Sequence, residues 1–452
     1  MTTKENEVEQ RMEQRPRIVV IGAGFGGLQA AKCLAKLPVD ITVIDKRNYH
    51  LFQPLLYQVA TADLSPADVA WPIRGIFSKQ HNVSVLLAKV VGIDTTGRKV
   101  LIENRPAIAY DYLVIATGAQ HTYFGNNGWA SSAPGLKRIS DAIELRKRIL
   151  VAFERAEATD DDAERRKQLN FVVIGGGPTG VEMAGSIAEL AHVALCGDFR
   201  RVNPAEARVV LIEGGPRLLP AFPPELSEHA KIDLERLGVD VILGRRVTRI
   251  DDACVVMGDE RLPAATKIWA AGVVASPAGH WLGVRTDQTG RIEVGADLSI
   301  SGHHNVFAIG DTAKSKAWDG NVVPGIAPAA KQAGAHVARV IAARLGLKPD
   351  PGPFRYRHLG NLATIGRHSA VIDIGRVKLT GWVAWWLWGL AHIYFLIGVR
   401  APVLVAAQWL WAYLSHRKGA RLITGLSPRY EPPVPSTLKP VFDSQRAGAR
   451  VK

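Results

Sequence analysis

The strongest constraint on how this chain can fold is a strand, glycine-rich turn and helix pattern that occurs twice. The first copy begins with RIVVIG at residues 17–22, whose glycine opens the turn GAGFGG, and continues into the helical stretch LQAAKCLAKL. The second copy, FVVIGGGPTGVEMAG at residues 171–185, repeats this order. In a Rossmann-like unit such glycines permit a tight turn, close approach of a pyrophosphate and tight helix packing. The pattern predicts two dinucleotide-binding units, with candidate glycines Gly22, Gly24, Gly26 and Gly27 in the first and Gly175, Gly177 and Gly180 in the second.

Each unit also carries an acidic residue at the end of a later strand. Asp45 ends ITVID, 23 residues after Gly22, and Glu213 ends VVLIE, 38 residues after Gly175. A carboxylate at this place accepts hydrogen bonds from an adenosine ribose. The longer second spacing predicts an extended helix and loop from His192. Glu213 would repel the 2′-phosphate of NADP and so favours NAD(H), although Arg217 offers a cation that leaves phosphate binding open.

Cysteine content and charge exclude several other chemistries. The chain has 452 residues and a formal net charge of +14. Its three cysteines, Cys33, Cys196 and Cys254, form no CxxC pair, which argues against a disulfide framework, a cysteine-ligated iron–sulfur cluster and an adjacent redox dithiol. A reduced, cytosol-facing compartment fits. Residues 1–16 are polar, lack the apolar core of a secretory signal and are expected to form a flexible tail.

The carboxyl-terminal region is apolar and rich in tryptophan. Between Gly381 and Ser415 the only charged residue is Arg400. Six of the eleven tryptophans lie here: Trp382, Trp385, Trp386, Trp388, Trp409 and Trp411. Tryptophan prefers the bilayer headgroup region, and the basic residues that follow would meet anionic lipid.

Residues 381–399 are long enough to cross a hydrocarbon core of ~30 Å. The spread of the tryptophans, the interrupting glycines and the cost of burying His392 and Arg400 favour instead a monotopic anchor that lies on the surface. A buried core or dimer helix is a further alternative. Nucleic-acid binding is not expected, because the basic residues follow an apolar anchor and do not form an aromatic-interleaved groove.

Two further segments read as strands that end near a glycine. Residues 112–118, YLVIATG, end in Thr117 and Gly118, and residues 305–312, NVFAIGDT, contain Gly310 and Asp311. In two-dinucleotide flavoproteins, which this chain resembles, such segments return to the first domain and contact the flavin. The resemblance implies an FAD-binding domain at 17–135 and 290–375, an NADH-binding domain at 136–289, and a membrane-anchoring region with a basic tail at 376–452.

More specifically, the chain resembles the type II NADH:quinone oxidoreductases, which are single-subunit, non-pumping respiratory dehydrogenases. The likeness rests on HLFQPLLYQVAT from His50, GGGPTGVEMAG from Gly175, LIEGGPRLLPAFPPELS from Leu211, WAAGV from Trp269 and LAHIYFLIGVR from Leu390. It implies an α/β, glutathione-reductase-like FAD/NAD(P) fold with two Rossmann-like domains and a C-terminal helical anchor. It also implies tightly bound FAD, NADH as co-substrate, ubiquinone or menaquinone as acceptor, no metal, and a peripheral place on the cytoplasmic face of the cell membrane. A homodimer is one arrangement that would broaden the membrane footprint.

The resemblance also assigns individual residues. It places Glu182 near the nicotinamide and quinone, where the alternative is an acid that only stabilises a helix end. It places Gln53 and Tyr57, with His50, near the flavin, where the alternative is loop packing. The WAAGV segment adds Ala271 and Gly272 as nucleotide contacts.

In the quinone motif of the family, APAAKQAG from Ala327 has Pro328 where a glutamine is expected. Gln332 is the remaining candidate quinone contact. Lys331 is an alternative donor, or a solvated residue on the helix surface. Two other functions stay open: a sulfide:quinone oxidoreductase, which needs a redox cysteine pair, and a membrane-tethered NAD(H)/flavin redox sensor without turnover.

Overall fold

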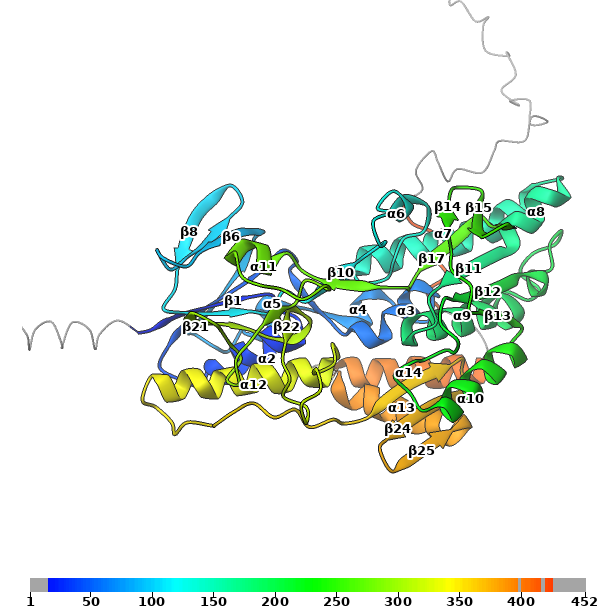
Figure 1. Ribbon diagram of the computed structural model, residues 1–452. Coiled ribbons are helices and arrows are strands. Elements are labelled where there is room, and N and C mark those ends of the chain that lie inside the picture. Colours follow the sequence, from blue (N-terminus) through cyan, green and yellow to red (C-terminus); the bar gives the residue numbers. More distant parts are fainter. Residues whose placement is uncertain (1–14, 397–399, 416–418, 426–452) are drawn as a thin grey trace, which may run out of the picture.

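The computed structural model describes residues 15–396, 400–415 and 419–425 (Figure 1). The predicted tail at 1–16 and the basic end of the chain therefore lie largely outside the described residues. The structure contains two main sheets, each built around one of the glycine turns.

The first sheet has six strands in the order β20-β21-β9-β1-β2-β5. The central strand β1 pairs in parallel with β2 and β9, and its residues Ile18 to Ile21 are buried, as expected for a strand covered on both faces. The strands are β1 (Arg17–Ile21), β2 (Asp40–Asp45), β5 (Val83–Leu87), β9 (Tyr112–Ile115), β20 (Ser299–Ile300) and β21 (His303–Ala308).

The second sheet has four parallel strands in the order β13-β12-β11-β17. They are β11 (Asn170–Ile174), β12 (Arg208–Glu213), β13 (Val239–Leu243) and β17 (Thr266–Trp269). The first sheet thus takes strands from both sides of the second in the sequence, in the arrangement expected for a split first domain. The exact domain boundaries remain a prediction. A short antiparallel pair, β10 (Ala119–His121) with β18 (Val273–Ala275), joins the two halves.

Helices follow both glycine turns. Helix α2 (Phe25–Leu34) follows the first turn and packs against α12 (Ala327–Arg344), whereas α9 (Pro178–Glu189) follows the second. A π-helical turn extends α9 at Leu190–Ala194, so the expected longer helix and loop before β12 is present. The other helices of at least four residues before the carboxyl-terminal region are α3 (Leu56–Ala60), α4 (Pro66–Val69), α5 (Ile73–Ile76), α6 (Trp129–Ser132), α7 (Ile139–Ala158), α8 (Asp162–Leu169), α10 (Pro224–Arg236) and α11 (Ala278–Leu282).

Smaller sheets complete the two halves. They comprise β3 (Tyr49–Leu51) with β4 (Ala70–Pro72), β6 (Val90–Asp94) with β7 (Lys99–Ile102) and β8 (Arg105–Ala109), β14 (Arg249–Ile250) with β15 (Cys254–Met257) and β16 (Glu260–Pro263), and β19 (Ile292–Glu293) with β22 (Ala313–Lys314).

The carboxyl-terminal region starts with an antiparallel sheet of β23 (Asn361–Ile365), β24 (Ser369–Ile374) and β25 (Val377–Thr380). Helix α13 (Gly381–Phe395) packs on β24, and α14 (Arg400–Ser415) contacts α13 and α4. Together with α12, these two helices lie along one side of the molecule (Figure 1). In the described part of the chain, no helix combines the length and apolar character needed to cross a bilayer.

Candidate active site

The first glycine turn has the geometry of a phosphate-binding loop. Gly22 has φ +98°, and a Cβ added there would lie 2.4 Å from the Ala116 carbonyl oxygen. A Cβ at Gly27 would lie 1.8 Å from the Gly22 oxygen, so the helix touches the turn. At Gly24, in contrast, an added Cβ would meet nothing within 4 Å. Two glycines are thus required by packing, and the third leaves space beside the amino terminus of α2, where phosphates bind well.

The second turn repeats this arrangement. Gly175 has φ +114°, and its added Cβ would lie 2.5 Å from the Ala270 carbonyl carbon. A Cβ at Gly180 would lie 1.8 Å from the Gly175 oxygen, while Gly177 faces open space at the start of α9. The residues of both turns therefore fit a dinucleotide pyrophosphate.

The acids Asp45 and Glu213 bind their own turns in the same manner. Asp45 Oδ2 accepts a hydrogen bond from the Ala23 amide at 2.8 Å, and Glu213 Oε2 accepts one from the Gly176 amide at 2.5 Å. Each carboxylate is thus fixed beside the open space of its turn. Arg217 donates instead to the carbonyl oxygens of Phe222 and Pro220, at 2.6 and 2.9 Å. Its guanidinium is engaged within its own loop, which weakens the alternative that it binds a 2′-phosphate.

The segments ending at Gly118 and Gly310 meet next to the first turn. Both glycines have positive φ, +68° and +65°. The fully buried Thr312 joins them, because its Oγ1 accepts a hydrogen bond from the Gly118 amide at 2.9 Å and contacts Thr117 Oγ1 at 3.2 Å. Thr312 was not predicted as a site residue, although it directly follows Asp311. The Asp311 carboxylate faces Lys137 Nζ at 3.9 Å.

The His50 side chain packs against the first turn. Its Nδ1 lies 2.8 Å from the Ala23 carbonyl oxygen, which can only accept, so Nδ1 carries the proton. Burial lowers the pKa of His50 to about 4, and the ring is neutral at physiological pH. The ring also meets Phe25 edge to face. These contacts support a packing role at the turn for His50.

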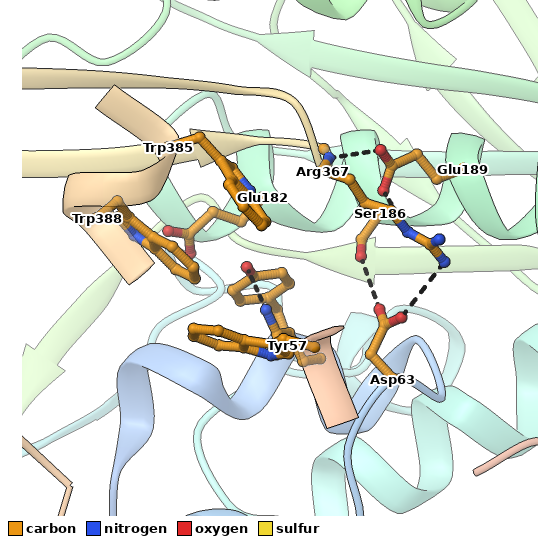
Figure 2. Close-up of a pocket in the computed structure, with 11 residues that line it drawn as sticks. Tyr57, Asp63, Glu182, Ser186, Glu189, Arg367, Trp385 and Trp388 are labelled. Atoms are coloured by element: carbon orange, nitrogen blue, oxygen red, sulfur yellow. Dashed lines mark hydrogen bonds and ion pairs between the residues drawn. The ribbon is translucent and has the colours of Figure 1, made fainter. Parts of the chain in front are cut away.

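A separate cavity lies between α9 and the carboxyl-terminal helices (Figure 2). Its empty space amounts to about 580 Å³, a volume that includes space open to solvent. Its walls are formed by one face of α9, by α3 and the loop that follows it, by the β23–β24 turn, and by helices α13 and α14. The lining residues are Tyr57, Gln58, Asp63, Glu182, Ser186, Glu189, Gly366, Arg367, Trp385, Trp388 and Trp409.

Glu182 and Tyr57 enter this cavity from opposite walls (Figure 2). Burial raises the pKa of the Glu182 carboxyl well above its usual value, and a backbone hydrogen bond at Thr364 only partly offsets this. Burial likewise raises the pKa of the Tyr57 hydroxyl well above its usual value. In both groups burial favours the protonated form, which is the behaviour expected of an acid that donates a proton.

Next to Glu182 a buried ion cluster joins three parts of the chain. Arg367 of the β23–β24 turn lies 3.9 Å from an Asp63 oxygen and 3.8 Å from a Glu189 oxygen. Thr61 Oγ1 and Ser186 Oγ lie 3.0 Å apart beside it. None of these residues was predicted from the sequence, because the pairing depends on segments that lie more than 100 residues apart.

Other predicted residues lie outside this cavity. Both ends of the Gln332 side-chain amide bind the backbone of Arg357, at 2.8 and 2.9 Å, which is a structural arrangement. Lys331 Nζ lies between the rings of Phe25 and Phe395, 5.5 and 4.9 Å from their centroids, rather than in solvent. The quinone roles proposed for Gln332 and Lys331 remain predictions.

The remaining predicted contacts belong to loops near the turns. Gln53 is exposed at the start of a short 3₁₀ turn, at Gln53–Leu55. Ala271 packs against Gly175, since a Cβ added at Gly175 would lie 2.6 Å from the Ala271 Cα. Gly272 follows Ala271 in the sequence. The tryptophans divide into two groups: Trp382, Trp386 and Trp411 are exposed, whereas Trp385, Trp388 and Trp409 line the cavity. The expectation that they all serve the membrane surface was wrong for the second group.

Comparison with known proteins gives a consistent family assignment. The family described as pyridine nucleotide-disulphide oxidoreductase matches residues 16–334, and the NDH2 C-terminal domain matches residues 358–418. A solved structure of NDH2 from Plasmodium falciparum in complex with NADH superposes with a TM-score of 0.82 at 22% identity, covering 89% of this chain and 99% of that one. At this identity the likeness shows the fold.

Sequence relatives are closer. The chain is 45% identical over 425 residues to the type II NADH:quinone oxidoreductase Ndh of Mycobacterium tuberculosis, covering 91% of both chains. It is 43% identical over 426 residues to NdhA of the same organism, covering 91% of this chain and 90% of the relative. A type II NADH:quinone oxidoreductase of Staphylococcus haemolyticus is 32% identical over 380 residues, covering 82% of this chain and 92% of the relative. With its two nucleotide turns, its carboxyl-terminal domain and these relatives, the chain belongs to the type II NADH:quinone oxidoreductase family.

Proposed function

We propose that this chain oxidises NADH and passes two electrons to a membrane quinone, without proton pumping, with FAD in the first nucleotide unit and NADH in the second. The observation that carries the proposal is the cavity at Glu182. Its one wall is the helix that follows the second glycine turn, and its other wall is formed by Trp385, Trp388 and Trp409 of the apolar helices. A water-soluble donor and a lipid-soluble acceptor need a site that borders both phases, and we propose that this cavity is that site.

The first unit offers what FAD would require. The open space at Gly24, the carboxylate of Asp45 and the joined ends at Gly118 and Gly310 suit a pyrophosphate, a ribose and a ribityl chain. A bound FAD supplies two-electron redox chemistry that no side chain of this protein can perform. Tyr57 of α3 lines the cavity, and Gln53 begins the short 3₁₀ turn that precedes α3.

Proton balance gives Glu182 its role. Reduction of a quinone to a quinol takes up two electrons and two protons, while NADH supplies a hydride, which is two electrons and one proton. One further proton must come from solution. Burial favours the protonated form of Glu182 beside the cavity, which supports a role in which Glu182 donates a proton at a quinone oxygen and is reloaded from water.

Membrane attachment is proposed to use the outer faces of α13 and α14. These faces carry exposed apolar side chains, namely Trp382, Val383, Trp386, Leu387, Leu390, Tyr394, Val403, Leu404, Leu410 and Trp411. Soluble proteins seldom expose so large an apolar area. We propose that this surface lies in the headgroup layer of the cytoplasmic face, next to anionic lipid, and that a homodimer broadens it.

The alternative of a sulfide:quinone oxidoreductase finds less support. A structure of that enzyme from Aquifex aeolicus superposes with a TM-score of 0.68 at 20% identity, which reflects the shared fold. Cys33 is half-buried in α2, Cys196 is exposed and Cys254 is buried in β15, and none of them lines the cavity. The redox cysteine pair that sulfide oxidation needs is thus not brought together.

Steady-state turnover tests the proposal. The purified, FAD-loaded protein is mixed with a soluble ubiquinone analogue and, in separate reactions, with NADH, NADPH or sulfide. We expect rapid oxidation of NADH, slower oxidation of NADPH and no oxidation of sulfide. Turnover with sulfide alone would favour the alternative enzyme, and no turnover with any donor would favour a redox sensor.

A further inference from the structure

Trp388 lines the cavity and carries a buried hydrogen-bond donor without a partner in the described part of the chain. Its side chain is 1% exposed, and its indole Nε1 has no partner among the residues that the structure describes. A buried N–H group without a partner destabilises the fold, so such groups usually serve a ligand or a water molecule. Trp388 lines the cavity beside Glu182 (Figure 2).

Tyr57 presents a second donor, and the reason is a chain of hydrogen bonds that begins on α14. Trp409 Nε1 can only donate, and it donates to Gln58 Oε1 at 2.8 Å. This contact fixes which end of the Gln58 amide is oxygen. The opposite end is then the NH₂ group, and it donates to the Tyr57 hydroxyl oxygen at 3.0 Å.

The direction of this chain determines what the Tyr57 hydroxyl can do. Because the oxygen already accepts from Gln58, its own proton is available to another acceptor. The described residues provide no hydrogen bond in which this hydroxyl is the donor. Through Trp409 and Gln58, helix α14 therefore leaves the Tyr57 hydroxyl free to donate a hydrogen bond.

We propose that Tyr57 and Trp388 donate hydrogen bonds to the carbonyl oxygens of the quinone head group, and that Gln58 and Trp409 are positioning residues that act through Tyr57. This inference rests on the proposed NADH:quinone function and names the residues that bind the acceptor. A quinone ring is apolar except for two carbonyl oxygens, which only accept. Two donors set among tryptophan rings, beside the Glu182 carboxyl, complement that chemistry.

The same bonds assist the reaction. Negative charge builds on the quinone oxygens as electrons arrive, and hydrogen bonds to a charged oxygen are stronger than those to a neutral carbonyl. The donors therefore stabilise the reduced head group while Glu182 supplies a proton. Neither Tyr57 nor Trp388 needs to lose its proton in this scheme.

The test compares two electron acceptors in the FAD-loaded enzyme. One is a short-chain ubiquinone analogue, which has carbonyl oxygens, and the other is ferricyanide, which takes single electrons without needing such donors. For Tyr57→Phe and Trp388→Phe we expect the ratio of quinone to ferricyanide kcat/KM to fall by roughly 3- to 10-fold, the effect of one lost hydrogen bond. The matched controls Tyr112→Phe on β9 and Trp281→Phe on α11 should keep the wild-type ratio.

A double-mutant comparison tests the positioning role. Trp409→Phe keeps the ring but removes its N–H, and it should lower the same ratio in the wild-type background. In the Tyr57→Phe background it should have no further effect, because no hydroxyl is left to orient. Flavin content verifies that each variant is folded.

Two results would contradict these roles, and a third would contradict the proposed function. Unchanged ratios in both Tyr57→Phe and Trp388→Phe would overturn the assignment of the donors. A full additional loss from Trp409→Phe in the Tyr57→Phe background would overturn the positioning role. A wild-type enzyme that reduces ferricyanide but no quinone would instead overturn the proposed function itself.

Discussion

The two helices that follow the glycine turns start alike and end in different surroundings. The seventh residue after the first glycine is Gln29 in α2 and Glu182 in α9. Helix α12 packs directly against α2. The two helices are so close that a Cβ added at Gly334 would lie 2.2 Å from the Gly26 carbonyl oxygen. Gln29 donates a hydrogen bond to Cys33 Sγ within its own helix, at 3.4 Å. On α9, by contrast, Glu182 opens on a cavity.

This difference shows how one local motif can serve two purposes. A turn that is sealed by a third helix is suited to a cofactor that stays bound. The helix after the second turn instead carries an acid at a cavity, where we propose that the quinone binds. The covering segment, which comes from a distant part of the sequence, therefore decides the role, and the turn itself decides only that a dinucleotide binds.

The largest effect is expected from the packing glycine of the second turn. Gly180→Ala would place a methyl group 1.8 Å from the Gly175 oxygen, and we expect the free energy of unfolding to fall by about 3 kcal/mol or more. Gly177→Ala adds the same methyl group in open space and should leave unfolding almost unchanged. Chemical denaturation of the two variants measures this. Equal destabilisation would show that the two glycines do not have separate roles.

Next in size is the loss of the cavity acid. Glu182→Gln should lower quinone turnover by about 100-fold, since a general acid contributes at least that much. The pKa of Glu182 is raised, so the wild-type rate should hold at low pH and fall as the pH rises through that value. Glu182→Gln should lack this alkaline fall. A pH profile of kcat checks both points, with the exposed Glu228→Gln as the control.

If Glu182→Gln keeps both the turnover and the alkaline fall, the proton-donor role is wrong. The residue would then be an acid that only stabilises the end of α9, and the contrast with Gln29 would have no functional meaning.

A smaller effect is expected from substituting the glycine of each turn that faces open space. Gly24→Ala should fold normally but hold FAD about 10-fold less tightly, because the added methyl group occupies the space left for phosphate. Gly177→Ala should keep its flavin and instead raise the KM for NADH by a similar factor. Flavin release during dialysis and NADH saturation curves give the two values. Loss of flavin from Gly177→Ala would reverse the assignment of the two units.

The smallest effect concerns the outer face of α13. Leu390 is 60% exposed there, and Leu390→Ala should weaken binding to vesicles of phosphatidylcholine and phosphatidylglycerol by about 1.5 kcal/mol, roughly 10-fold. Leu101, 40% exposed on β7, provides a matched control, and Leu101→Ala should bind as the wild type does. Sedimentation with vesicles measures this, and equal binding of both variants would argue against α13 as the membrane surface.

The sequence predicted best what short segments determine. Strand, turn and helix follow each other within about 20 residues, so Gly22, Gly175 and Asp45 could be assigned from spacing alone. The split of the first sheet around the second was expected from the resemblance to flavoproteins, and the strand order agrees with it.

The cavity could not be predicted in the same way. It depends on contacts such as Trp409 with Gln58 and Arg367 with Asp63, which join residues about 300 or more positions apart. Composition suggested a membrane role for all six tryptophans of the last region, because exposed and cavity-lining tryptophans have the same hydropathy. The two groups are separated by the packing of α13 against β24 and by the contacts of α14 with α13 and α4.

The most direct test of the account is the absorbance spectrum of the purified protein under anaerobic conditions. We expect an oxidised flavin spectrum that NADH bleaches and that an added ubiquinone analogue restores. A protein that stays colourless after incubation with FAD, or a bound flavin that NADH does not bleach, would contradict the claim that the two glycine turns hold a flavin and its electron donor.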